Sequence, residues 1–116
     1  MNDRMDLQAL MSAEERTPPQ SKALFALLNL GIVESLANGL MSAADAPRLF
    51  YHADNCLFVR KRLRDKAADE IMSRGVQLPD LFEALSTDEA QREFQRELAT
   101  MRGLCLKLLE KKPLVA

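Results

Sequence analysis

The densest group of residues that could do chemistry is a basic run in the middle of the chain. It holds five cations and one acid within seven residues, the cations being Arg60, Lys61, Arg62, Arg64 and Lys66. Such a group can neutralise phosphates, and its arginines could read base edges. A short helix and a turn precede it, as in a DNA-binding helix-turn-helix. The simpler interpretation is a solvated helix face balanced by acids such as Asp69 and Glu70.

A second group has the residue types of a metal site. His52, Asp54 and Cys56 alternate within five residues. A structural zinc site needs four ligands, and the whole chain has one histidine and two cysteines, so Cys105 would have to complete it. The alternative is that Asp54 or Asn55 caps the helix that follows, next to a core cysteine. We favour the cap and predict no metal and no other cofactor.

Nucleophilic catalysis needs groups that this chain does not bring together in sequence. A Cys–His pair needs a positioned base and an oxyanion hole, which usually comes from glycine-rich backbone or a helix start. The four glycines are scattered at positions 31, 39, 75 and 103. The sequence has no phosphate-binding loop, no GxSxG and no HExxH. We therefore predict that the chain is not an enzyme.

An apolar seam near the C-terminus is a candidate for contact with another helix. Its members step by four and three residues, as Phe94, Leu98, Met101, Cys105 and Leu108. This is the heptad spacing of helices that pack along each other. The seam could pack inside the chain, form an interface with a second helix from another molecule, or share both roles. Six methionines add adaptable apolar surface, which suits a partner or a core.

The length and composition of the chain are those of one ordinary globular domain. The chain has 116 residues, of which 47% are hydrophobic and 28% charged. Sixteen basic and seventeen acidic residues give a net charge of −1, whereas nucleic-acid binders usually carry a basic surplus. No apolar run is long enough for a membrane span, and residues 1–16 do not read as a secretory signal. We predict a cytoplasmic protein whose two cysteines are reduced.

The elements that must position these groups are predicted to be helices. Leucine and alanine dominate the apolar residues, which favours helix over strand. We predict an all-α fold, a compact bundle of four to six helices in a single domain. An N-terminal arm with a short helix occupies 1–19, the bundle 20–112 and a C-terminal tail 113–116. The predicted core residues are Leu24, Leu28, Ile32, Leu36, Val59, Leu63, Phe94, Leu98, Met101 and Leu108.

Local signals predict where the helices begin and end. Pro18 and Pro19 are expected to stop the first short helix, and Asn38–Gly39 to end the first long one. Ser42 with Asp45, and Ser86 with Glu89, have the spacing of capping boxes. The resulting helices are 20–38, about 43–51, 55–73 closed by Gly75, 79–85 and 87–112.

One segment carries a resemblance. Residues 31–51 read Gly-Ile-Val-Glu-Ser-Leu-Ala-Asn-Gly-Leu-Met-Ser-Ala-Ala-Asp-Ala-Pro-Arg-Leu-Phe-Tyr. This succession of a helix end, a cap and a second helix resembles a stretch in small bacterial all-helical proteins of unknown function. The resemblance implies a helical fold, and no activity or functional residue.

Together these patterns predict a non-enzymatic helical protein–protein interaction or regulatory module. Its partner is expected to be a second copy, in a homodimer, or another protein. The alternative is a DNA-linked regulator that uses the basic run at 60–66. The two hypotheses differ in the surface that matters, which is the apolar seam of the last helix in one and the basic run in the other.

Overall fold

The structure of the protein is a computed structural model, and it describes residues 4–12 and 17–111. The described residues contain six α-helices, one π-helical turn and no strand, which confirms the predicted all-α fold. The elements are α1 (Leu7–Ser12), α2 (Pro18–Ala37), α3 (Asp45–Leu49), α4 (Ala53–Phe58), the π-helix η1 (Val59–Leu63), α5 (Lys66–Ala84) and α6 (Thr87–Lys111). The predicted tail at 113–116 lies outside the described residues. None of the described helices is long and apolar enough to cross a membrane.

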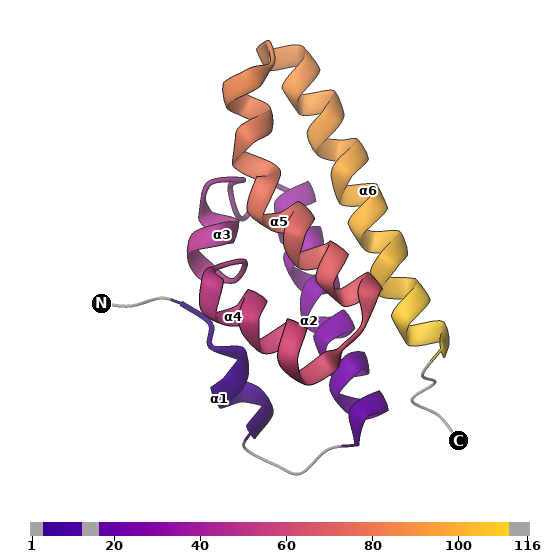
Figure 1. Ribbon diagram of the computed structural model, residues 1–116. Coiled ribbons are helices and arrows are strands. Elements are labelled where there is room, and N and C mark those ends of the chain that lie inside the picture. Colours follow the sequence, from indigo (N-terminus) through magenta and orange to yellow (C-terminus); the bar gives the residue numbers. More distant parts are fainter. Residues whose placement is uncertain (1–3, 13–16, 112–116) are drawn as a thin grey trace.

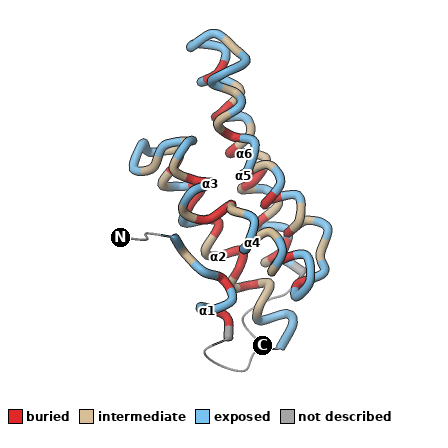
Figure 2. Tube along the Cα trace, turned by 60° about the vertical axis from the view of Figure 1, so that its left-hand side comes forward, coloured by how far each residue is buried: buried red, intermediate tan, exposed pale blue. Residues whose placement is uncertain are grey.

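Three long helices form the frame of the molecule. α6 packs along both α2 and α5. Figure 1 shows α5 and α6 as an antiparallel hairpin whose closed end projects beyond α2 and α3, while α1, α3 and α4 lie on one side of it. The hairpin is therefore packed at its base, and its closed end is mostly exposed in the tube of Figure 2.

The start of α2 corrects the predicted effect of the two prolines. Pro18 and Pro19 occupy the first turn of the helix, where a missing N–H costs nothing. Thr17 precedes them as the cap, because its hydroxyl accepts from the Gln20 amide at 3.3 Å and the Gln20 side chain accepts from the Thr17 amide at 3.0 Å. At the other end, Gly39 takes a left-handed φ of 74° just after the helix, as predicted.

A break at Arg64 and Asp65 corrects the predicted helix 55–73. Arg64 adopts a left-handed conformation, with φ 49° and ψ 53°, and ends the π-helical turn. The Asp65 carboxylate then accepts hydrogen bonds from the amides of Ala67 and Ala68 at 2.9 and 3.3 Å. It caps a new helix, α5, which the cations around Asp65 concealed in the sequence.

α5 then continues through two residues that were predicted to bound it. Gly75 and Pro79 both lie inside the helix, so the predicted end at Gly75 and the separate helix 79–85 are wrong. The Tyr51 ring occupies the space that a Cβ of Gly75 would fill. That contact is tertiary, and local sequence does not show it.

The short helices are capped by local side chains. Ser42 and Asp45 form the predicted reciprocal bonds, at 3.1 and 3.2 Å. α4 begins two residues earlier than expected, because His52 is its cap and accepts from the Asn55 amide at 3.4 Å. The prediction that Asp54 or Asn55 caps this helix is therefore wrong.

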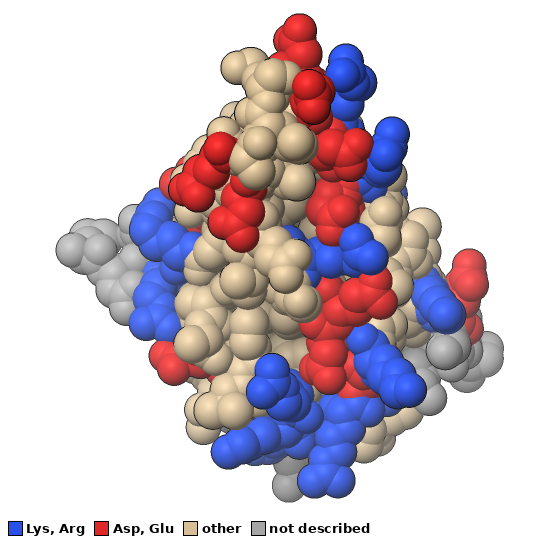
Figure 3. Space-filling view, turned by 45° about the horizontal axis from the view of Figure 1, so that its top comes forward, with Lys and Arg blue, Asp and Glu red and all other residues tan. Residues whose placement is uncertain are grey.

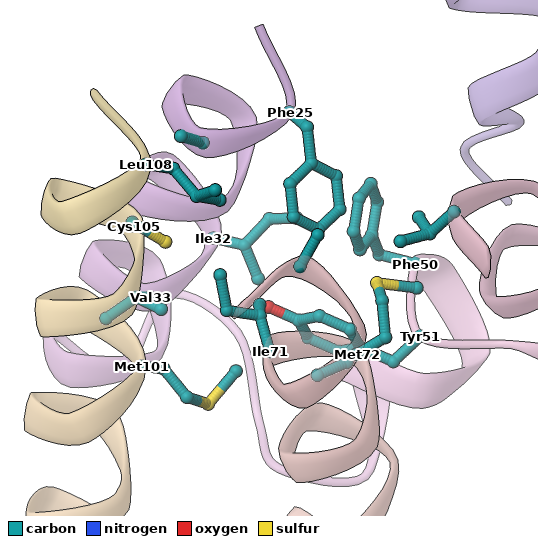
Figure 4. Close-up of a cluster of buried hydrophobic side chains, with 14 of the residues drawn as sticks. Phe25, Ile32, Val33, Phe50, Tyr51, Ile71, Met72, Met101, Cys105 and Leu108 are labelled. Atoms are coloured by element: carbon teal, nitrogen blue, oxygen red, sulfur yellow. The ribbon is translucent and has the colours of Figure 1, made fainter. Parts of the chain in front are cut away.

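The core lies where α2, α5 and α6 meet. Figure 4 shows side chains from all three helices converging, together with the two aromatic residues that follow α3: Phe25, Ile32, Val33, Phe50, Tyr51, Ile71, Met72, Met101, Cys105 and Leu108. Eight of the ten predicted core residues are buried. Leu24 and Leu28 are only half-buried, because α2 turns Phe25, Ala26 and Asn29 to the interior instead.

Candidate functional site

The first candidate surface is the basic cluster, which we define as Arg60, Lys61, Arg62, Arg64 and Lys66. It spans the junction of η1 and α5, and all five residues are exposed. None of them forms an ion pair with another described residue. On the face shown in Figure 3, basic side chains gather at the lower edge. The cluster is thus a patch of uncompensated positive charge.

Two of the three acids nearest the basic cluster in sequence are engaged with other groups. Asp65 caps α5 and pairs with Lys22 at 3.4 Å, and Glu70 pairs with Arg74 at 2.8 Å. Asp69 forms no ion pair with a described residue. Neither Asp69 nor Glu70 therefore forms an ion pair with a member of the cluster.

The backbone beneath the basic cluster differs from a helix-turn-helix. A recognition helix presents residues from its N-terminal part to the major groove. Here the cations occupy a π turn, the left-handed residue Arg64 and the first position of α5. The Arg62 guanidinium lies over the Phe58 ring at 5.7 Å, and the Arg64 Nε donates to the Lys61 carbonyl at 3.4 Å. The cations are therefore not carried by one regular recognition helix.

The apolar seam of α6 lies inside the chain's own core. All five members are buried, with exposed fractions of 6% or less: Phe94, Leu98, Met101, Cys105 and Leu108. They face α2 and α5. This burial fits the role inside the chain that was considered for them. Their heptad spacing serves packing within the chain.

The second candidate surface is a groove that sequence reasoning missed, here called the hairpin groove. It has a volume of about 630 Å³ and lies between the end of α2, the 39–44 segment, and the projecting part of the α5–α6 hairpin. Its apolar lining includes Leu36, Met41, Pro79, Phe82 and Phe94. The Phe82 and Phe94 rings meet edge to face, with centroids 5.3 Å apart. The groove is therefore a shallow apolar trough whose lining includes an edge-to-face pair of aromatic rings.

Apolar surface continues at the rim of the hairpin groove. Leu40, between the lining residues Gly39 and Met41, is 82% exposed, and Phe82 is 38% exposed. Polar lining comes from Ser42, Glu83, Gln91 and Gln95. The sequence signal that could have pointed to the groove is Leu40, a leucine that directly follows Gly39 in the turn after the first long helix.

The residues considered for a metal site hold the N-terminal arm instead. The Arg4 guanidinium donates to His52 Nδ1 at 2.8 Å and pairs with the Asp54 carboxylate at 2.7 Å. His52 Nε2 contacts the Met5 carbonyl at 2.9 Å, so both ring nitrogens are occupied. Among the described residues no three potential ligands are grouped closely enough for a metal ion.

The two cysteines are free thiols in different settings. Cys56 is half-buried and Cys105 is buried. Burial raises the pKa of Cys56, and it raises the pKa of Cys105 to about 12. Both thiols are therefore protonated at neutral pH, and neither is prepared to act as a nucleophile.

The comparisons with known proteins place this arrangement in a family. No curated protein and no solved structure matches the chain. One family model matches residues 16–115, which include the segment 31–51 whose pattern resembles helical proteins of unknown function. The chain belongs to the family described as "Protein of unknown function (DUF3969)".

Proposed function

We propose that the chain is a non-enzymatic interaction module whose hairpin groove binds the apolar face of a helix from a partner protein. The observation that supports this most is the exposed apolar surface around the groove. Leu40 and Phe82 leave large hydrophobic side chains in water on either side of a trough that is itself apolar. Contiguous patches of this kind are uncommon on soluble monomers and are usually binding sites.

The shape of the hairpin groove favours a chain segment over a small molecule. Small-molecule sites bury most of the surface of their ligand. This groove is a shallow trough, and its apolar surface extends beyond it to Leu40. An amphipathic helix places apolar side chains at i, i+3, i+4 and i+7 in such a trough.

The charge around the groove sets the chemistry expected of the partner. Glu83 belongs to the lining, and Asp80, Asp88 and Glu89 lie on the same projecting end of the hairpin. Acidic groups around an apolar trough select partners with basic flanks and speed their encounter. We therefore expect a partner helix with leucine-type anchors and lysine or arginine beside them.

The DNA alternative rests on the basic cluster. Five unpaired cations would give sequence-independent phosphate contacts whose affinity falls steeply with salt. Against it stand the net charge of −1 and the position of the cations across a π turn and the start of α5. It ranks second, and a duplex-binding assay at low salt tests it directly.

A titration followed by NMR tests the groove proposal. The probe is a synthetic amphipathic helix with leucines on one face and lysines on its flanks, added to the ¹⁵N-labelled full chain. We expect the amide signals of the groove lining to shift most, including those of Met41, Phe82 and Gln95. A peptide with glutamates in place of the lysines should bind more weakly.

Substitutions on and off the groove provide the comparison. Leu40→Lys and Phe82→Lys should reduce peptide binding, whereas Leu106→Lys should not, because Leu106 is 46% exposed on α6 and does not line the groove. Shifts centred away from the groove, or an equal loss in the Leu106 variant, would argue against the proposal. The absence of any shift with either peptide would reject it.

A further inference from the structure

Most of the charged side chains that form no ion pair with a described residue fall in two groups of opposite sign. One is the basic cluster. The other, here called the acidic tip, consists of four exposed acids at the closed end of the hairpin, where the exposed Arg92 also lies: Asp80, Glu83, Asp88 and Glu89. None of the four forms an ion pair with a described residue. Each group therefore keeps a charge that the described part of the chain does not neutralise.

The two groups lie at opposite ends of α5. Lys66 is the first residue of this helix and Asp80 lies 14 residues further along it, so the nearest members of the two groups are about 21 Å apart at 1.5 Å per residue. That distance is more than twice the screening length of about 8 Å at physiological salt. On the face shown in Figure 3, several acidic side chains lie toward the upper tip, next to some basic ones, and basic side chains gather at the lower edge. One molecule cannot pair these groups with each other.

We infer that the basic cluster docks against the acidic tip of a second copy, so that two chains lie antiparallel along α5. A twofold arrangement makes both contacts at once, because each molecule offers one group of each sign. Between the groups, the exposed middle of α5 carries the uncharged residues Ser73, Val76 and Gln77. Val76 is 44% exposed and supplies apolar contact at the centre of the pair.

The charge balance favours a second copy over a polyanion. A nucleic acid or an anionic membrane would meet the basic cluster, and it would also meet a chain of net charge −1 with an acidic tip. In a pair of copies the acids of the tip become attractive groups, because each tip meets the basic cluster of the other copy. Exposed ion pairs are individually weak, so the association is expected to be modest and salt-dependent.

Sedimentation of the full chain at a series of concentrations and salt levels tests the inference. The wild-type chain is expected to dimerise at low salt and to dissociate as salt rises. Lys61→Glu with Lys66→Glu reverses the basic cluster, and Asp80→Lys with Glu83→Lys reverses the acidic tip. Each pair of substitutions should weaken self-association about tenfold or more.

These four substitutions are compatible with folding. Glutamate at position 66 falls in the first turn of α5 and lysine at 80 and 83 near its last turn, where those signs suit the helix dipole. A circular-dichroism melt checks each variant. Lys107→Glu with Glu110→Lys reverses two exposed charges of α6 outside both groups and is the control, with association expected to be unchanged.

Mixing the variants makes the test specific. The basic-reversed and acid-reversed chains should form a one-to-one pair with each other, and the chain that carries all four substitutions should dimerise again. A wild-type chain that stays monomeric at low salt overturns the inference, as does a dimer that either reversal leaves intact. Binding of duplex DNA or anionic vesicles that is lost on reversing the basic cluster also overturns it, since the cluster then serves a polyanion.

Discussion

The ring of Tyr51 packs against Gly75 in the middle of α5, where a Cβ would overlap it. The hydroxyl of the same tyrosine donates to Asn29 Oδ1 at 2.8 Å, and Asn29 Nδ2 donates to the Phe25 carbonyl at 2.9 Å. Tyr51 thus joins α2 to α5 through one ring and one buried hydrogen bond. This contact makes glycine necessary at position 75 and holds the base of the hairpin against the body.

Replacing Gly75 with alanine is expected to destabilise the protein although alanine is the better helix former. The new Cβ would force the Tyr51 ring to move within a packed core, at a cost of about 1–3 kcal/mol in the free energy of unfolding. Gly103→Ala is the matched control, since Gly103 is exposed in α6 and has nothing within 4 Å of its Cβ position. It should stabilise by about 0.5–1 kcal/mol. Urea unfolding of both variants decides the matter, and a stabilised Gly75 variant would show that the ring contact is absent.

Tyr51 should resist ionisation until the protein unfolds. Burial raises its pKa above the usual tyrosine value, so the folded state keeps a proton that the unfolded state loses above about pH 10. Stability is therefore unaffected below that pH and falls as pH rises beyond it. Tyr51 is the only tyrosine and the chain has no tryptophan, so phenolate absorbance reports on this residue alone. Phenolate formation in a chain that still shows its helical signal would contradict the burial described here.

Asn55 should be the main anchor of the N-terminal arm. Its buried side chain accepts from the Leu7 amide at 3.0 Å and donates to the carbonyls of Met5 and Phe50 at 3.0 and 2.8 Å. Asn55→Ala would leave these groups without partners, costing about 1–3 kcal/mol, and should speed hydrogen exchange at the Leu7 amide. Asp54→Asn, which removes only an exposed ion pair with Arg4, should cost less than about 1 kcal/mol. Equal effects of the two substitutions would locate the anchor in the ion pair instead.

The left-handed conformation of Arg64, at the break before α5, should lower the stability of the protein. A left-handed conformation costs a residue with a Cβ about 1–2 kcal/mol, and glycine largely escapes that cost. Arg64→Gly should therefore stabilise the protein by about 0.5–1 kcal/mol, whereas Arg64→Ala should bring no gain. Thermal melts of the two variants give the comparison. If the alanine variant is the more stable of the two, the strain lies elsewhere.

Much of the helical architecture follows from local sequence. The preference for leucine and alanine over β-branched residues favours the all-α class. Asn38–Gly39 marks a helix end through the left-handed backbone of Gly39, and Ser42 with Asp45 marks a helix start through hydrogen bonds between their side chains and backbone amides. The seam of α6 could be read as packing surface because heptad spacing puts its five members on one side of a helix. These features depend on residues a few positions apart, so they can be predicted from the local sequence.

Only the tertiary structure decides the rest. Gly75 was predicted to end a helix, and it lies inside α5 with the ring of Tyr51, distant in sequence, in the space beside it. The seam of α6 could serve a partner or a core, and burial against α2 and α5 assigns it to the core. The hairpin groove exists because α5 runs past Pro79 and carries the hairpin beyond α2. A groove between elements far apart in the chain depends on how those elements pack, and no local pattern specifies that.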